Sequence, residues 1–226
     1  NISSNGTIVG NLDLLEFDTV YAKHIAIAGP YDNNTFTVAY CNNSADTTLV
    51  SFWIQENGTI SSVLDNMLVD GNGCDYPATI NVTNNMSLTS YTRSAGYNDY
   101  RTTRYIYPNG SIGETIESVY PDSDRHSMSS WVRIYDDTFL DIFENDGNAQ
   151  AERGRVYRVS PTGSITLIDY LDYTENTYNS WKWQDPVRHI QGNIYAHATR
   201  DYDNDGWMKT MEVVTERGII KPGVYG

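Results

Sequence analysis

The sequence predicts an all-β protein built from four consecutive repeats of about 53 residues, each with four short antiparallel strands. Two observations lead to this prediction. A glycine-centred turn recurs at nearly constant spacing, and the segments between the turns are rich in β-branched and aromatic residues. No segment keeps the 3.6-residue apolar period of an amphipathic helix, so almost no helix is expected.

The recurring turn has the pattern Asn-Gly-Thr/Ser-Ile. Its glycines stand 52, 52, 53 and 55 residues apart. Asn-Gly tolerates the positive φ angles of a tight hairpin, so each copy predicts a turn between two strands. The copies are Asn5-Gly6-Thr7-Ile8, Asn57-Gly58-Thr59-Ile60, Asn109-Gly110-Ser111-Ile112, Thr162-Gly163-Ser164-Ile165 and the degenerate Arg217-Gly218-Ile219-Ile220.

Four strands are expected in each period, because four β-rich segments fit between successive turns. The first set covers residues 24–27, 78–82, 131–135 and 187–190, and the second covers 35–40, 86–91, 138–143 and 193–197. The strands before the glycine turns cover 49–54, 103–107, 155–159 and 211–214, and those after them cover 59–64, 111–116 and 164–168.

These units resemble the blades of extracellular β-propeller repeat proteins, which also have four short antiparallel strands in a period of this size. The resemblance implies one propeller-like domain over residues 1–226, with repeats at about 5–56, 57–108, 109–161 and 162–216. Residues 217–226 would begin a fifth repeat or supply a closing strand. Tandem small β-domains, a β-solenoid and an open β array remain alternatives.

The charge of the chain excludes some partners. The net charge is -14 over 226 residues, which disfavours binding to nucleic acid or to an anionic membrane surface. No apolar stretch approaches the roughly 18 residues that a membrane span requires.

Eight Asn-x-Ser/Thr acceptors indicate an extracellular or cell-surface protein with N-linked glycans, all of them before residue 112. One half of the chain would carry sugar, and the bare half would be left for contacts. Asparagine-rich turns without sugar are the alternative. The acceptors are Asn1, Asn5, Asn33, Asn42, Asn57, Asn81, Asn85 and Asn109.

The two cysteines, Cys41 and Cys74, predict one disulfide, because an even count is typical of secreted proteins. Two buried free thiols are the alternative.

Residues 201–212 match the twelve-residue pattern of a calcium-binding loop. The expected ligands are Asp201, Asp203, Asp205, the backbone carbonyl of Trp207 and the carboxylate of Glu212. Lys209 departs from the pattern, and the flanking segments look like strands. The loop therefore resembles calcium loops between strands, as in integrin-type propeller repeats, more than an EF-hand. A plain acidic turn is the alternative to Ca²⁺ binding.

No residue pattern indicates catalysis. The four histidines, His24, His126, His189 and His197, lack zinc spacing, and there is no nucleophile elbow or phosphate-binding glycine loop. The tryptophans Trp181, Trp183 and Trp207 could stack on sugars or pack between blades.

The sequence therefore favours a secreted, non-enzymatic structural or adhesive glycoprotein, such as a subunit of a surface layer or filament. Its partners would be further copies of itself or other extracellular proteins and glycans. A carbohydrate-binding propeller (a lectin) is the first alternative, and a glycoside hydrolase or lyase is the second.

Overall fold

The computed structural model describes residues 13–93, 98–120, 126–145, 151–172, 187–200, 206–214 and 219–222. This part of the chain forms four antiparallel sheets of four strands each, which we call blades 1 to 4 in chain order. The one helical element in these residues is a short 3₁₀ turn, η1 (Asp32–Asn34), and no described helix could cross a membrane. The predicted all-β fold of four-stranded repeats is confirmed.

Within each blade the strands lie in chain order, joined by successive hairpins. Blade 1 contains β1 (Lys23–Ala28), β2 (Thr35–Cys41), β3 (Thr47–Trp53) and β4 (Asp65–Asp70). Blade 2 contains β5 (Asp75–Thr83), β6 (Met86–Thr92), β7 (Asp99–Ile106) and β8 (Ile112–Val119). Blade 3 contains β9 (His126–Arg133), β10 (Thr138–Asn145), β11 (Ala151–Val159) and β12 (Ile165–Asp172). Blade 4 contains β13 (Val187–Gln191), β14 (Ile194–Arg200), β15 (Gly206–Val214) and β16 (Ile219–Pro222).

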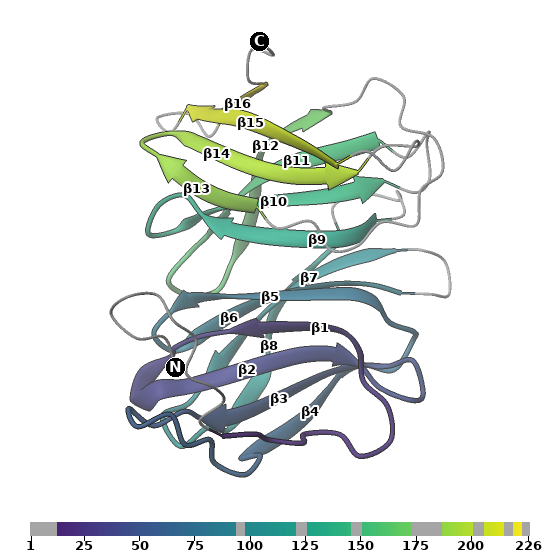
Figure 1. Ribbon diagram of the computed structural model, residues 1–226, viewed down its shortest axis with the longest axis vertical. Helices are drawn as coiled ribbons and strands as arrows, with labels where there is room; N and C mark the ends of the chain where they lie inside the picture. Colours follow the sequence, from purple (N-terminus) through teal and green to yellow (C-terminus); the bar gives the residue numbers. More distant parts are fainter. Residues whose placement is uncertain are drawn as a thin grey trace.

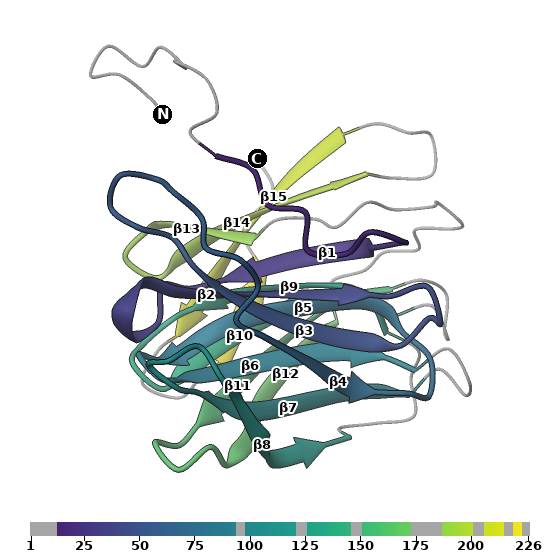
Figure 2. The ribbon, with the colours of Figure 1, turned by 90° about the horizontal axis from the view of Figure 1, so that it is seen from below.

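The blades are stacked face to face in chain order, with blade 1 at the bottom and blade 4 at the top of Figure 1. Seen from below, β1 and β4 lie on opposite sides of the stack (Figure 2). The first strands are neighbours, since β1 contacts β5 and β5 contacts β9. The four blades do not close into a ring in the described residues, because blades 1 and 4 are at opposite ends of the stack (Figure 1).

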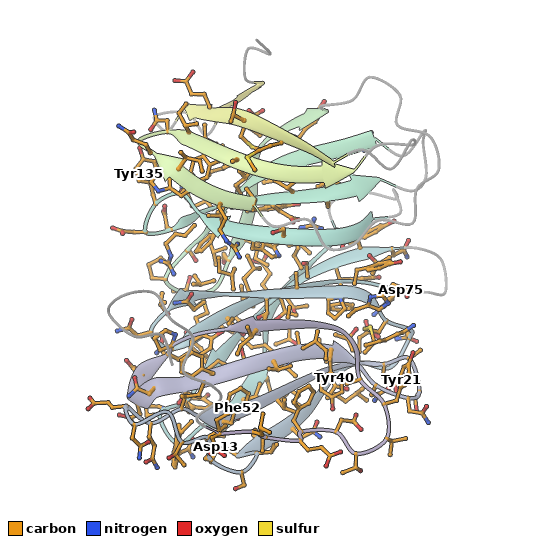
Figure 3. All side chains as sticks on the ribbon, viewed as in Figure 1. Asp13, Tyr21, Tyr40, Phe52, Asp75 and Tyr135 are labelled. Carbon is orange, nitrogen blue, oxygen red and sulfur yellow. A yellow bond between two sulfur atoms is a disulfide. The ribbon has the colours of Figure 1, made fainter. Side chains whose placement is uncertain are left out.

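The strands have two chemically different ends. The turns at Gly58, Gly110 and Gly163 lie at the end that we call the hairpin end, where Tyr135 also lies (Figure 3). Asp75 lies at the opposite end, next to the disulfide between Cys41 and Cys74, and we call this the disulfide end (Figure 3).

Gly58, Gly110 and Gly163 each lie between the third and fourth strands of their blade, and the four blades span residues 23–70, 75–119, 126–172 and 187–222. An interval such as 57–108, counted from turn to turn, therefore contains the last strand of one blade and the first three strands of the next. The segment at 217–226 contains β16, which pairs with β15 as the fourth strand of blade 4.

The hydrophobic core lies between the blades. The middle strands β2 and β3 are buried along almost their whole length, because neighbouring chain covers both of their faces. The outer strands β1 and β4 alternate between exposed and half-buried residues. The buried core residues between blades 1 and 2 are Ala28, Tyr31, Ala39, Leu49, Ile106 and Ile112. Those between blades 2 and 3 include Met86, Leu88, Trp131, Phe139 and Tyr157, and those between blades 3 and 4 include Leu140, Ile142, Tyr195, Met211 and Val213.

Neighbouring blades are joined by hydrogen bonds at the glycine turns. The hydroxyl of Ser51 in blade 1 donates to the carbonyl of Gly110 in blade 2 at 2.5 Å. The hydroxyl of Thr103 in blade 2 donates to the carbonyl of Gly163 in blade 3 at 2.6 Å. The two glycines have φ angles of +87° and +91° and are buried against side chains of the preceding blade. The glycine is therefore needed both for its backbone angle and for the close approach of the next blade.

A buried charge cluster lies between blades 2 and 3. The guanidinium of Arg101 is fully buried, donates to a carboxylate oxygen of Asp141 at 2.5 Å and also pairs with Asp99. It lies 5.0 Å from the centre of the Tyr157 ring. A buried charge is tolerated only when it is paired and hydrogen-bonded, so Arg101 depends on both carboxylates.

Replacing Gly110 by alanine should destabilise the fold strongly. A Cβ atom at Gly110 would lie 2.3 Å from Leu64 Cδ1, in addition to the strain of a φ angle of +87°. We expect a loss in the free energy of unfolding of about 2–4 kcal/mol, measured by urea denaturation, because overpacking and strain add. Gly192→Ala is the matched control. Gly192 also has a positive φ angle (+55°) but has no atom within 4 Å of the added Cβ, so its loss should be near 1 kcal/mol. Equal losses in the two variants would contradict the close blade contact at Gly110.

Candidate functional site

Six of the eight predicted glycan acceptors lie in the described part of the chain. Four of them are exposed and lie in turns at the hairpin end, namely Asn33, Asn57, Asn85 and Asn109. Asn42 and Asn81 are half-buried, and Asn42 is at the disulfide end. Asn1 and Asn5 lie outside the described residues. Glycosylation stays a prediction, and any sugars on the four turn residues would gather at one end of the strands.

The predicted calcium loop falls mostly outside the described residues, which include none of Asp201, Asp203 and Asp205. Trp207 and Glu212 lie on β15, where Glu212 is opposite Ile194 on β14 and Lys221 on β16. Across the described ranges, no three His, Cys, Asp or Glu side chains are grouped as a metal site. Calcium binding at residues 201–212 therefore stays a prediction.

The predicted disulfide is confirmed, and it connects blade 1 with blade 2. Cys41 ends β2 and Cys74 precedes β5, so the bond joins segments 33 residues apart in sequence. Two further links lie close by. Lys23 pairs with Asp75 at 3.8 Å, and the rings of His24 and Tyr76 are 4.3 Å apart.

His24 and Tyr76 share an unusual backbone. Both lie at a β-bulge in the first strand of their blade and have positive φ angles, +52° and +48°. A non-glycine residue in this region is strained and persists where the surrounding structure holds it. The disulfide and the Lys23–Asp75 pair supply that support, so this corner is rigid.

An open groove of about 410 Å³ lies at the hairpin end of blade 1. One wall comes from the turn between β1 and β2, and the other from the end of β3. Its lining residues are Asn33, Asn34, Trp53, Ile54, Gln55 and Glu56.

Three hydrogen bonds position the residues around the groove, and the first of them joins its two walls. The amide of Ile54 donates to the carbonyl of Asn34 at 3.1 Å, and the side-chain amide of Asn33 donates to the carbonyl of Pro108 in blade 2 at 3.2 Å. The amide of Trp53 donates to the hydroxyl of Ser61 at 2.9 Å. Because these bonds hold the lining segments in position, the groove is preformed, as is typical of small-molecule sites.

Trp53 is the main apolar surface of the groove. Its side chain is half-buried, and its indole N–H is buried without a hydrogen-bond partner among the described residues. Asn34, Gln55 and Glu56, which carry side-chain amides and a carboxylate, also line the groove. A flat indole beside amide and carboxylate groups suits a ligand that has both an apolar face and hydroxyl groups, as a sugar ring has.

Other aromatic residues form a stack at the disulfide end. The rings of Tyr91, Tyr100 and Tyr120 lie one over the next at 5.7 and 5.5 Å. Arg93 lies 4.0 Å from the centre of the Tyr100 ring and pairs with Asp70 at 2.6 Å. The polar groups of this stack are satisfied within the protein, as when Tyr120 donates its hydroxyl to Asn98, so the stack has a structural role.

The tryptophans that the sequence singled out are not among the described lining residues of the groove. Trp181 and Trp183 lie outside the described residues, and nothing is described of the Trp207 side chain. Trp53 does line the groove, but in the sequence it was identified only as part of the strand segment 49–54. Its place four residues before the Asn57-Gly58 turn was the available signal, since that position lies next to the turn between β1 and β2.

No protein-family model matches the chain, and no curated protein matches it in sequence. Similar solved structures do exist. A Hadza microbial sialidase superposes with a TM-score of 0.56 at 8% identity, over 90% of this chain and 46% of the sialidase. The fold is of the β-propeller type. A Bombyx mori β-fructofuranosidase gives a TM-score of 0.54 at 13% identity, over 88% of this chain and 48% of that one.

An exo-β-1,3-galactanase of Phanerochaete chrysosporium, solved with β-1,3-galactotriose, gives a TM-score of 0.51 at 13% identity, over 90% of this chain and 50% of the enzyme. The chain thus spans about half the length of these structures. At such low identity the likeness shows the fold alone.

These similar folds contradict the expectation of a non-enzymatic structural or adhesive protein. Several of them are enzymes whose names state an action on sugars, including the sialidase, the fructofuranosidase and the galactanase. The comparison favours the carbohydrate-related alternative instead. The physical reason for the error is that composition and sequons describe the surface and the compartment, and neither describes what the folded surface binds.

Lowering the pH from 8 to 5.5 should destabilise the protein through His24. Burial of the imidazole and the charge of Lys23 lower the pKa of His24 below its ordinary 6.5, although Asp75 raises it. The unfolded chain therefore takes up this proton at a higher pH than the folded chain does. Stability is complete above about 6.5 and is lost as the pH falls through the folded-state pKa. His24→Gln should lose less stability than the wild type over this range, as measured by urea denaturation. His189→Gln, at an exposed histidine, is the control, and the same pH profile in both variants would contradict the assignment to His24.

Proposed function

We propose that this chain is a carbohydrate-binding domain of the β-propeller type, and that the groove beside Trp53 holds the sugar. The observation that carries the proposal is the set of residues that line the groove, in which Trp53 lies beside residues that carry side-chain amides and a carboxylate. The names of the similar folds, which include enzymes acting on fructosides, sialosides and galactans, support the same ligand class.

The groove has room for a small sugar ligand. Its volume of about 410 Å³ is within the range of roughly 300–1,000 Å³ that is usual for ligand pockets. The indole of Trp53 would contact the C–H face of a sugar ring. The amides of Asn34 and Gln55 would donate to ring hydroxyls or accept from them, and the carboxylate of Glu56 would accept from two neighbouring hydroxyls.

Binding is the chemistry that this lining supports. Hydrolysis of a glycosidic bond normally needs two carboxyl groups at a separation of about 5–10 Å. Among the residues that line the groove, Glu56 is the only one with a carboxyl group. The buried pair Asp99 and Asp141 is bound to Arg101 inside the core, away from solvent.

We further propose that the protein is secreted. A disulfide between two blades is typical of proteins that fold in an oxidising compartment. The exposed Asn-x-Ser/Thr turns support the same location.

Trp53→Ala should remove sugar binding. We expect the wild type to retain one or more oligosaccharides on a glycan array, and calorimetry with the retained sugar to give a Kd that rises at least about tenfold in Trp53→Ala, because the stacking surface is lost. Glu56→Gln is a milder variant on an exposed side chain and should weaken binding while leaving the unfolding curve unchanged.

Tyr135→Ala is the control, since Tyr135 is an exposed aromatic residue at the same end of the strands but outside the groove. An array on which the wild type retains no sugar would overturn the proposed function. So would a sugar that binds equally well to Trp53→Ala.

A further inference from the structure

The groove beside Trp53 is bordered by two of the predicted glycan acceptors. Asn33 is one of its lining residues, and Asn57 comes directly after the last lining residue in the sequence. Both asparagines are exposed. Thr35, which completes the Asn33 acceptor, is fully buried, and its hydroxyl donates to the carbonyl of Asp32 at 2.9 Å. A sugar on Asn33 would therefore begin at the wall of the groove, on a turn that is held in place.

The side-chain amide of Asn33 is positioned by blade 2. Its nitrogen donates to the carbonyl of Pro108 at 3.2 Å. A side-chain amide nitrogen has two N–H groups, and one remains after a sugar is attached, so the bond to Pro108 and a glycan are compatible. The bond restricts the direction in which the first sugar leaves the turn. Trp53 is close by, since it lies opposite Thr35 in the register of β2 and β3 and also lines the groove.

The position of Trp53 recurs in every blade. It belongs to the third-strand residue that lies opposite the first residue of the second strand. In each case the next residue along the third strand donates its amide to the carbonyl of the turn before the second strand. From blade 1 to blade 4 the position is occupied by Trp53, Tyr105, Arg158 and Glu212. The side chains at one structural position can therefore be compared between blades.

Blade 2 repeats the arrangement of an aromatic surface between two acceptors. Tyr105 is half-buried, and its ring lies 6.3 Å from that of Tyr107, which is 48% exposed. Asn85 lies in the turn before β6, and its carbonyl accepts from the amide of the residue that follows Tyr105. Asn109 lies two residues after Tyr107, in the glycine turn. Both of these acceptors are exposed.

Blades 3 and 4 have neither the aromatic residue nor the acceptors. In blade 3 the guanidinium of Arg158 pairs with Asp137 of the neighbouring turn at 3.4 Å. In blade 4 the position is occupied by Glu212. The sequence contains no Asn-x-Ser/Thr acceptor after Asn109. An aromatic residue needed for blade packing would be expected in all four blades, so its restriction to the blades with acceptors indicates that it contacts the glycans.

We propose that the groove beside Trp53 holds the N-linked glycan of this same chain, attached at Asn33. The proposal rests on the sugar-binding function proposed above and names the sugar. In the secretory pathway the glycan comes from a lipid-linked oligosaccharide. A bond forms between the Asn33 amide nitrogen and the anomeric carbon, the bond from that carbon to the lipid pyrophosphate breaks, and the pyrophosphate takes up one amide proton. The first sugars then lie against the indole of Trp53.

A tethered sugar competes with free sugars for the groove. A ligand held by a short linkage acts at an effective concentration of roughly 1 mM or more. When the tethered sugar binds with a dissociation constant of about 0.1 mM, this concentration raises the apparent Kd of a free sugar about tenfold. The glycan on Asn33 therefore shields the groove, and the chain without this glycan binds free sugars most tightly.

Calorimetry with N,N′-diacetylchitobiose, the disaccharide core of a eukaryotic N-linked glycan, tests the proposal. We expect the wild type from a host without N-glycosylation to bind it. The wild type from a eukaryotic host should carry a glycan on Asn33, detected by peptide mass mapping, and should bind the disaccharide at least about tenfold more weakly. An unmodified Asn33, or equal Kd values, would overturn the proposal. An unglycosylated protein that retains other sugars on a glycan array but not this one would overturn it while leaving the proposed function intact.

Substitutions at Thr35 separate the Asn33 glycan from the others. Thr35→Ala removes the acceptor and Thr35→Ser keeps it, and neither changes a lining residue of the groove. Thr35→Ala should bind the disaccharide equally well from either host, because the competing sugar is absent. Thr35→Ser should retain the difference of about tenfold between hosts. The same difference in both variants would assign the effect to glycans elsewhere and contradict the proposal.

Thermal unfolding tests the contact between glycan and indole without any free sugar. It therefore decides the proposal even where a wild type that retains no sugar has overturned the proposed function. Production in the eukaryotic host should raise the Tm of Thr35→Ser by about 2–4 °C more than that of Thr35→Ala, because the stacked sugar stabilises the folded state. Combining each variant with Trp53→Ala should abolish this difference. A difference that is absent, or that persists without the indole, would overturn the proposal.

Discussion

The hydrogen bonds at the glycine turns are the constraint on which the rest of this structure depends. Between blades 1 and 2 and between blades 2 and 3, a fourth-strand carboxylate accepts from the backbone amide that follows the turn, and Asp13 makes the same contact on blade 1. Third-strand hydroxyls also reach the carbonyls of Gly110 and Gly163. Because these turn atoms are backbone, blade spacing depends on a bare glycine at φ near +90°. Apolar side chains fill the remaining space between the sheets, and the hydrogen bonds at the turns fix how the sheets are placed.

The same turns determine where ligand chemistry is available. Trp53 to Glu56 lead directly into the Asn57-Gly58 turn, and the bond from Ile54 to Asn34 holds them beside the turn before β2. The contacts that position these turns therefore also hold the walls of the groove in place. At the opposite end, the Cys41–Cys74 bond and the His24–Tyr76 contact hold blades 1 and 2 together. The open groove therefore lies at the hairpin end of the strands, and the covalent link between blades 1 and 2 lies at the disulfide end.

The charged residues divide between the surface and the core with different consequences. Most acidic side chains contribute to the net charge of -14 and keep the surface solvated. Asp99 and Asp141 instead neutralise Arg101 in an interior that excludes water. Such a cluster specifies how blades 2 and 3 meet, since any sliding of one blade over the other would leave a buried charge unpaired.

The sequence by itself determined the all-β class, the positions of the hairpins and the cysteine pair. These depend on local backbone preference, as in Asn57-Gly58, or on a count of two cysteines. Only the tertiary structure decided that a glycine turn lies inside a blade, that Trp53 faces a groove and that Arg101 is buried. Each of these depends on residues from different strands meeting in space, as Arg101 meets Asp141. The expectation of a non-enzymatic structural or adhesive role was wrong for the same reason, because composition describes a surface without describing its shape.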